Sequence, residues 1–154
     1  MYLEQVNRRA FLQLSSLAIP LFATDQQSDP WSSGDLIQPA DLAQRMKNGE
    51  ALHIICVVFP VLYRQRHITG ALLAGPGSKP EGIAALDSAL KDIPRGRYIV
   101  LYCGCCPMQR CPNIRPAYAE AKKLGFRNVL VLDLPQNFHT DWVAKGYPVD
   151  SSAA

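Results

Sequence analysis

The chain has 154 residues, of which 48% are hydrophobic and 19% are charged. This composition is typical of one compact domain, and it argues against a chain that is mainly disordered or that forms a bundle of membrane helices. The formal net charge of +3 comes from 16 basic and 13 acidic residues scattered along the sequence, with no basic block to follow a phosphate backbone, so no nucleic-acid partner is expected.

The first residues resemble an export signal. Residues 7–13 (NRRAFLQ) contain two adjacent arginines followed, after one residue, by two large apolar side chains, which is typical of a twin-arginine signal. The moderately apolar stretch that ends at Ala23 is too short to span a bilayer. We therefore predict a signal peptide over residues 1–23, export to the periplasm, and no stable membrane insertion after the signal is removed. The alternative is an amphipathic first helix, which Pro20 fits poorly.

A polar segment and then one domain are expected after the signal. Residues 24–33 (TDQQSDPWSS) have the composition of a linker, and the domain is expected to cover residues 34–150. In chain order, we predict a strand at 35–37, a helix at 39–46, a strand at 52–58, a turn and short strand at 67–73, a helix at 81–91, a strand at 97–103, a helix at 113–124, a strand at 129–132 and a short helix at 138–145.

The alternation of strands and helices predicts the fold class. The strand at 52–58 is a continuous apolar run, which suits a parallel strand buried on both faces. We expect an α/β fold with an open, mostly parallel central sheet flanked by helices on both faces. In such folds ligands bind beyond the carboxyl ends of the strands.

Cysteines are the most informative residues of the sequence. Four of the five, Cys103, Cys105, Cys106 and Cys111, fall within nine residues, which is too local for a disulfide framework that spans the fold. Cys56 stands alone in an apolar strand and is expected to belong to the core.

Cys103 is the predicted nucleophile. It ends a strand, and the loop after it leads into a helix, so backbone N–H groups and a helix N-terminus are expected to face its sulfur. These donors, with Arg110 folded back over the loop, are expected to lower the pKa of the Cys103 thiol and make it reactive near neutral pH.

Several local motifs, in order, resemble the rhodanese (thiosulfate sulfurtransferase) family. They are the turn His67-Ile68-Thr69-Gly70-Ala71, the strand Val100-Leu101-Tyr102-Cys103, the segment Lys123-Leu124-Gly125-Phe126-Arg127-Asn128-Val129, Trp142, and Gly146-Tyr147-Pro148. The resemblance covers residues 34–149. It implies a rhodanese-like fold and a persulfide on Cys103, which takes sulfur from a thiosulfate-like donor and passes it to a thiol or to cyanide.

The resemblance also implies a loop that cradles an anion and needs no cofactor and no resident metal. Its members here are Gly104, Cys105, Cys106, Arg110, Cys111 and Asn113. His67 lies in the turn that faces the site in this family and is expected to brace that turn by hydrogen bonds rather than to act as a base. His53 and His139 are further candidates to line a pocket.

The chain departs from the family pattern, and these departures leave alternatives open. Cys56-Val57-Val58 stands where the family commonly has Asp-x-Arg, Pro135-Gln136-Asn137-Phe138 replaces a glycine pair, and the cysteine loop is about five residues longer than usual. With the extra thiols, Cys106 or Cys111 becomes a candidate resolving cysteine that attacks the persulfide. A thiol-disulfide redox protein and a soft-metal-binding module are therefore the alternative functions.

Overall fold

The computed structural model describes residues 28–152. The predicted signal peptide (residues 1–23) and the first part of the predicted linker lie outside the described residues. None of the helices within residues 28–152 is both long and apolar enough to cross a membrane.

Five parallel strands form the central sheet, in the order β1-β6-β5-β2-β4. Their bounds are β1 (Leu36–Ile37), β2 (Leu52–Cys56), β4 (Leu72–Leu73), β5 (Tyr98–Tyr102) and β6 (Asn128–Leu132). The middle of β5 is completely buried, as expected for a parallel strand covered on both faces. The predicted mostly parallel sheet is confirmed.

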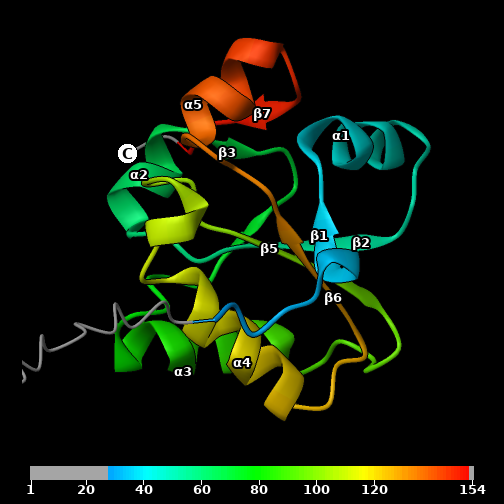
Figure 1. Ribbon diagram of the computed structural model, residues 1–154, viewed down its shortest axis with the longest axis vertical. Helices are drawn as coiled ribbons and strands as arrows, with labels where there is room; N and C mark the ends of the chain where they lie inside the picture. The colour runs from blue at the N-terminus through cyan, green and yellow to red at the C-terminus, as the bar shows by residue number, and fades with distance from the viewer. Residues whose placement is uncertain (1–27, 153–154) are drawn as a thin grey trace, which may run out of the picture.

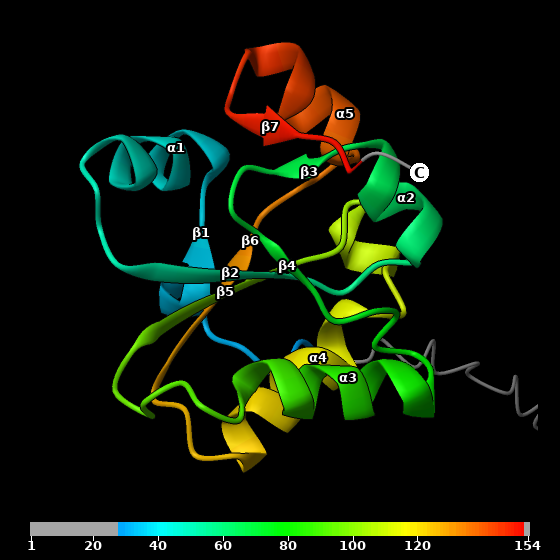
Figure 2. The same ribbon diagram turned by 180° about the vertical axis from the view of Figure 1, so that it is seen from behind.

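Helices cover both faces of the sheet, which confirms the predicted fold class. Figures 1 and 2 show α1 and α5 on one face and α3 and α4 on the other. The helix bounds are α1 (Pro39–Lys47), α2 (Pro60–Gln65), α3 (Pro80–Leu90), α4 (Ile114–Lys123) and α5 (Phe138–Asp141). This arrangement follows from the right-handed crossovers of parallel sheets. The connection through α1 crosses the sheet in one direction, and the connections through α3 and α4 cross it in the opposite direction, so the two sets of helices lie on opposite faces.

Helix α2 was not predicted from the sequence. It begins with proline at its first position, as α1 and α3 do, and this proline was the available signal. The predicted last helix at 138–145 is in fact α5 followed by a 3₁₀ turn (Val143–Lys145). The predicted segment at 67–73 splits into β4 and β3 (His67–Ile68), and β3 pairs antiparallel with β7 (Val149–Asp150).

Part of the predicted linker packs on the domain. Trp31 is 8% exposed, and its ring meets the ring of Tyr118 edge-on at 5.6 Å. Asp29 forms an ion pair with Arg115 at 2.6 Å. The packed part of the chain therefore begins before Gly34, where the sequence placed the domain boundary.

Strand β5 positions the cysteine loop. It lies between β2 and β6, and in the register of the sheet Cys56 of β2 is opposite Tyr102 of β5. After β2 the next strand of the sheet, β4, lies toward one edge, and after β5 the next strand, β6, lies toward the other edge. The connections that follow the neighbouring strands β2 and β5 therefore diverge at the carboxyl end of β5. Ligand sites of open parallel sheets form at such points, and Cys103 is the next residue.

Candidate active site

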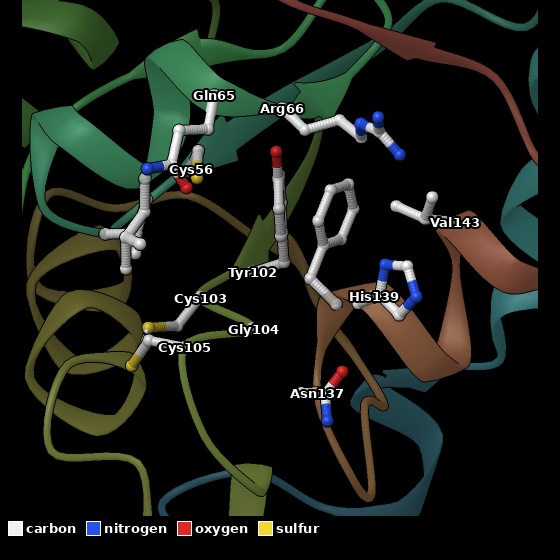
Figure 3. Close-up of a pocket in the computed structure, with 13 residues that line it drawn as sticks. Cys56, Gln65, Arg66, Tyr102, Cys103, Gly104, Cys105, Asn137, His139 and Val143 are labelled. Carbon is white, nitrogen blue, oxygen red and sulfur yellow. Dashed lines mark hydrogen bonds between the residues drawn. The ribbon is translucent and has the colours of Figure 1, made fainter.

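Cys103 lines a cavity of about 480 Å³ beyond the carboxyl ends of β2 and β5. Its side chain is 6% exposed. Figure 3 shows the sulfur atoms of Cys103 and Cys105 side by side at one end of this cavity, while the Tyr102 side chain extends away from them toward Arg66. The position agrees with the expectation that Cys103 stands at the sheet edge where ligands bind.

Gly104 turns the chain so that Cys105 returns toward Cys103. Its φ is +75°, a left-handed conformation that favours glycine. A Cβ at this position would lie 2.5 Å from the Cβ of Phe138, and the Phe138 N–H donates to the Gly104 carbonyl at 3.0 Å. The start of α5 is therefore packed directly against the cysteine loop, and only glycine fits between them.

The rest of the loop brings Cys111 back toward Cys103 and Cys105. Residues Met108–Arg110 form a 3₁₀ turn, and the Met108 N–H donates to the Leu134 carbonyl at 3.1 Å. This contact fixes the turn to the segment after β6. Cys111 follows it, is 2% exposed and stands just before α4.

Three thiols converge as a result. The sulfurs of Cys103 and Cys105 are 3.1 Å apart, and those of Cys103, Cys105 and Cys111 all lie within 4.8 Å of one another. We call these three residues the thiol cluster. Cys106 contacts Cys105 with a sulfur–sulfur distance of 3.4 Å but lies outside the cluster. All five cysteines lie in the described residues, and none is in a disulfide.

Asn113 is the polar residue that contacts the cluster from inside the fold. It is 1% exposed and occupies the N-cap position of α4, where its side chain makes no capping hydrogen bond to the helix. Its Nδ2 donates to Cys103 Sγ at 3.4 Å and to Cys105 Sγ at 3.9 Å, and its Oδ1 accepts the Ser78 N–H at 3.1 Å. Because both ends of the amide are engaged, its donor is held toward the sulfurs.

The contacts within the cluster favour negative charge on Cys111 over the other two sulfurs. Hydrogen bonds from the Cys103 and Cys105 thiols lower the pKa of Cys111, and the backbone N–H groups of Asn113 and Ile114 add to this effect against the cost of burial. These two N–H groups belong to the start of α4, where a helix has unpaired donors.

The pKa of Cys103 is raised, which corrects the expectation of a lowered pKa. Its hydrogen bond with Cys105 favours the thiolate, but its hydrogen bond to Cys111, burial and the nearby charge of Cys111 outweigh that effect. Hydrogen bonds to Cys103 and Cys111, followed by burial, raise the pKa of Cys105 as well. The donors of the loop favour a thiolate at Cys111 rather than at Cys103, where the sequence placed it.

Arg110 does not lie over the thiol cluster. It is exposed and does not line the Cys103 cavity, but lines a second hollow together with Gln109, Cys111 and Arg115. The cation that lines the Cys103 cavity is Arg66, at the end of α2. Figure 3 shows Arg66 across the cavity from the sulfurs, beyond the Tyr102 ring. Sequence reasoning missed this residue because α2 was not predicted.

The remaining walls of the cavity are mostly apolar. Val58, Leu62, Phe138 and Val143 line it, together with the polar residues Gln65, Asn137 and His139. His139, one of the two further candidates, is thus a wall residue (Figure 3), and His53, on β2, is not. Small anions and thiols have room to reach Cys103 in a cavity of this size.

His67 and Cys56 occupy structural positions. His67 is 6% exposed, stacks on Tyr63 with ring centroids 3.8 Å apart, and its Nδ1 is 2.8 Å from the Tyr63 carbonyl oxygen. These contacts fit the expected bracing role. Cys56 is 2% exposed, and burial raises the pKa of its thiol to about 12, so it remains protonated at neutral pH.

Comparisons with known proteins agree with this geometry. The sequence profile of the rhodanese-like domain matches residues 38–134. A search of curated proteins gives no match.

Among solved structures, the BH2092 protein of Bacillus halodurans is similar with a TM-score of 0.59 and 25% identity over 75% of this chain and 76% of that one. The Alr3790 protein of Anabaena sp. is similar in its crystal structure, with a TM-score of 0.58 and 22% identity over 77% of this chain and 94% of that one. The solution structure of its rhodanese-like domain gives a TM-score of 0.56 and 24% identity over 76% of this chain and 79% of that one.

A five-stranded parallel sheet with a cysteine loop after its central strand defines an α/β domain with a thiol-based site. The chain belongs to the rhodanese-like domain family, whose profile covers more than half of it.

Proposed function

We propose that this protein is a sulfurtransferase that carries sulfane sulfur as a persulfide on Cys103. The observation that carries the proposal is the position of the Cys103 sulfur: it faces a solvent-connected cavity and has a second thiol at 3.1 Å and an amide donor at 3.4 Å. Donors of this kind stabilise the charge of a thiolate or of a persulfide anion.

The first step loads the cysteine. Cys103 loses its proton to solvent through the cavity, and hydrogen bonds from Cys105 and Asn113 favour the resulting thiolate. The Cys103 thiolate then attacks the outer sulfur of thiosulfate, a sulfur–sulfur bond forms, the bond to the sulfonate sulfur breaks, and sulfite leaves with the electron pair. Arg66, the cation of the cavity wall, attracts the dianionic donor.

The second step unloads it. A thiolate or cyanide attacks the outer sulfur of the persulfide, and the Cys103 thiolate is the leaving group. The products are a new persulfide or thiocyanate, and the protein returns to its starting state with no net redox change.

A second outcome is favoured by the 3.1 Å distance between the sulfurs of Cys103 and Cys105. The Cys105 thiolate can attack the Cys103 sulfur of the persulfide, which forms a Cys103–Cys105 disulfide and releases hydrosulfide. The nearest resolving cysteine is therefore Cys105, which the sequence did not single out, whereas Cys111 lies within 4.8 Å and Cys106 stands outside the cluster. An external thiol must then reduce the disulfide before the next turnover.

Intact-mass measurement tests this function. After incubation with thiosulfate without a thiol, Cys105→Ser is expected to gain and keep one sulfur atom, and Cys103→Ser is expected to gain none. The wild type is expected to gain the same sulfur and then to release sulfide while losing two hydrogens. Equal sulfur loading in Cys103→Ser would refute the assignment, and Cys106→Ser provides a control in which a thiol outside the cluster is removed.

Export belongs to the same proposal. Two adjacent arginines and a short apolar stretch within residues 7–23 support delivery of the folded protein to the periplasm. A fusion to a reporter that is active only after export is expected to give a signal with the native sequence and none when Arg8 and Arg9 are both replaced by lysine. A signal that persists in the double variant would contradict export by this route.

A further inference from the structure

Three sulfur atoms from separate parts of the site form a group of the size that one metal ion requires. Cys103 comes from the end of β5, Cys105 from the turn after Gly104, and Cys111 from the segment before α4. Their sulfurs lie within 4.8 Å of one another. A flat, three-coordinate ion with metal–sulfur bonds of about 2.3 Å requires sulfurs about 4.0 Å apart. The Cys103–Cys105 pair has to open from 3.1 Å toward that value, a movement of less than about 1 Å.

The donor set selects the class of metal. The group contains only thiols, with no carboxylate or imidazole among the described residues that belong to it. Thiolates favour soft ions, and Cu(I) accepts three of them, whereas structural zinc sites usually have four ligands. Asn113 would support the ligands without binding the ion, because its Nδ2 donates to two of the three sulfurs.

The cluster also has a route for an ion to enter. Cys103 and Cys111 are buried, but Cys105 is exposed, so an incoming ion first meets Cys105 and then the two inner sulfurs. Burial of the other two sulfurs limits access of water and oxidants to the bound ion.

We propose that Cys103, Cys105 and Cys111 form a binding site for one Cu(I) ion, coordinated by three thiolates. The site uses the same sulfur that the proposed sulfurtransferase reaction uses, but it does not depend on that reaction. Cu(I) and a persulfide exclude each other at Cys103, so the metal-bound protein accepts no sulfur from thiosulfate.

Anaerobic competition with a chromophoric Cu(I) chelator tests the site. Reduced full-length wild type is expected to withdraw one equivalent of Cu(I) from the chelator. Cys105→Ser and Cys111→Ser are each expected to bind more than about 100-fold more weakly, since loss of a ligand costs more than loss of an outer contact. The matched control is Cys106→Ser, which removes the adjacent loop thiol outside the cluster and is expected to bind as the wild type does.

X-ray absorption and circular dichroism complete the test. The copper-bound wild type is expected to show three sulfur neighbours at about 2.3 Å, and the three variants are expected to give the wild-type circular dichroism spectrum. A wild type that withdraws no Cu(I), an affinity of Cys106→Ser as low as that of Cys105→Ser, or a sulfur count of two would each overturn the proposal.

Failure of the metal site and failure of the sulfurtransferase function give different results. Cys105→Ser is expected to load sulfur from thiosulfate but to lose tight Cu(I) binding. If the sulfurtransferase proposal is wrong, neither the wild type nor Cys105→Ser gains sulfur, while Cu(I) binding by the wild type remains.

Discussion

The side-chain amide of Asn113 donates to Cys103 Sγ at 3.4 Å from a completely buried position. Its oxygen accepts the Ser78 N–H at the same time, so one side chain joins the cysteine loop to the segment between β4 and α3. That segment approaches closely, because a Cβ on Gly77 would lie 2.1 Å from the Asn113 carbonyl oxygen. Asn113 therefore connects the stability of the fold to the chemistry of Cys103.

Replacement of Asn113 by alanine is expected to affect both properties. The change leaves the Ser78 N–H without its acceptor and removes the amide donor from the sulfurs, so the free energy of unfolding is expected to fall by about 1–3 kcal/mol. Sulfur loading of Cys103 is expected to slow because its thiolate loses a donor. Urea denaturation and intact-mass kinetics measure the two effects. Asn48→Ala, which removes an exposed amide just after the end of α1, is the control, and equal losses in both variants would contradict the role of Asn113.

Gly104→Ala is expected to destabilise the protein more than Gly146→Ala. Both glycines have a φ of +75°, so each substitution brings a left-handed alanine that costs about 1–2 kcal/mol. Only at position 104 does the new Cβ meet another atom, at 2.5 Å from the Cβ of Phe138, whereas nothing lies within 4 Å at position 146. Urea denaturation of the two variants isolates the cost of the contact. Equal free energies of unfolding would show that α5 does not restrict the cysteine loop.

Arg66→Ala is expected to weaken the use of an anionic sulfur donor. Arg66 lines the cavity, but it is exposed to solvent, so loss of its charge is expected to lower kcat/KM for thiosulfate by only about two- to fivefold. The difference should shrink as salt is added. The control is Arg64→Ala, because Arg64 lies on the same helix and does not line the cavity.

Arg110→Ala is the companion variant, because the sequence alone favoured Arg110 as the cation of the site. It is expected to have wild-type kcat/KM, since its side chain lines a different hollow. A larger loss in Arg110→Ala than in Arg66→Ala would restore the sequence-based assignment.

Cys111→Ser is expected to remove the one thiolate that persists at neutral pH. Hydrogen bonds from Cys103 and Cys105 lower the pKa of Cys111 to about 2, so its charge is present at neutral pH and is lost only in strong acid. Ultraviolet thiolate absorbance of the wild type is therefore expected to show one thiolate at pH 7, and that of Cys111→Ser none. Cys106→Ser should keep the signal. Its presence in Cys111→Ser would place the charge on another sulfur.

The sequence by itself determined the order and type of most elements. The spacing of apolar residues and the length of each segment distinguish the buried strand β5 from the amphipathic helix α4, and both features are read from local side-chain patterns. The placement of Cys103 directly after the central strand, and therefore at the ligand-binding edge of the sheet, follows from the same patterns. Helix α2 is too short for a clear pattern, and Trp31 packs through a contact distant in sequence, so neither was predicted.

Only the tertiary structure decided which cysteines meet and where the charge lies. The loop conformation depends on Gly104 against Phe138 and on Met108 against Leu134, contacts between segments that are remote along the chain. These contacts bring Cys105 and Cys111 to Cys103, leave Cys106 aside, and direct the free N–H groups of α4 at Cys111. A local sequence pattern records the chemistry of each side chain, but the distances and donors that set the reactivity of a thiol arise from packing.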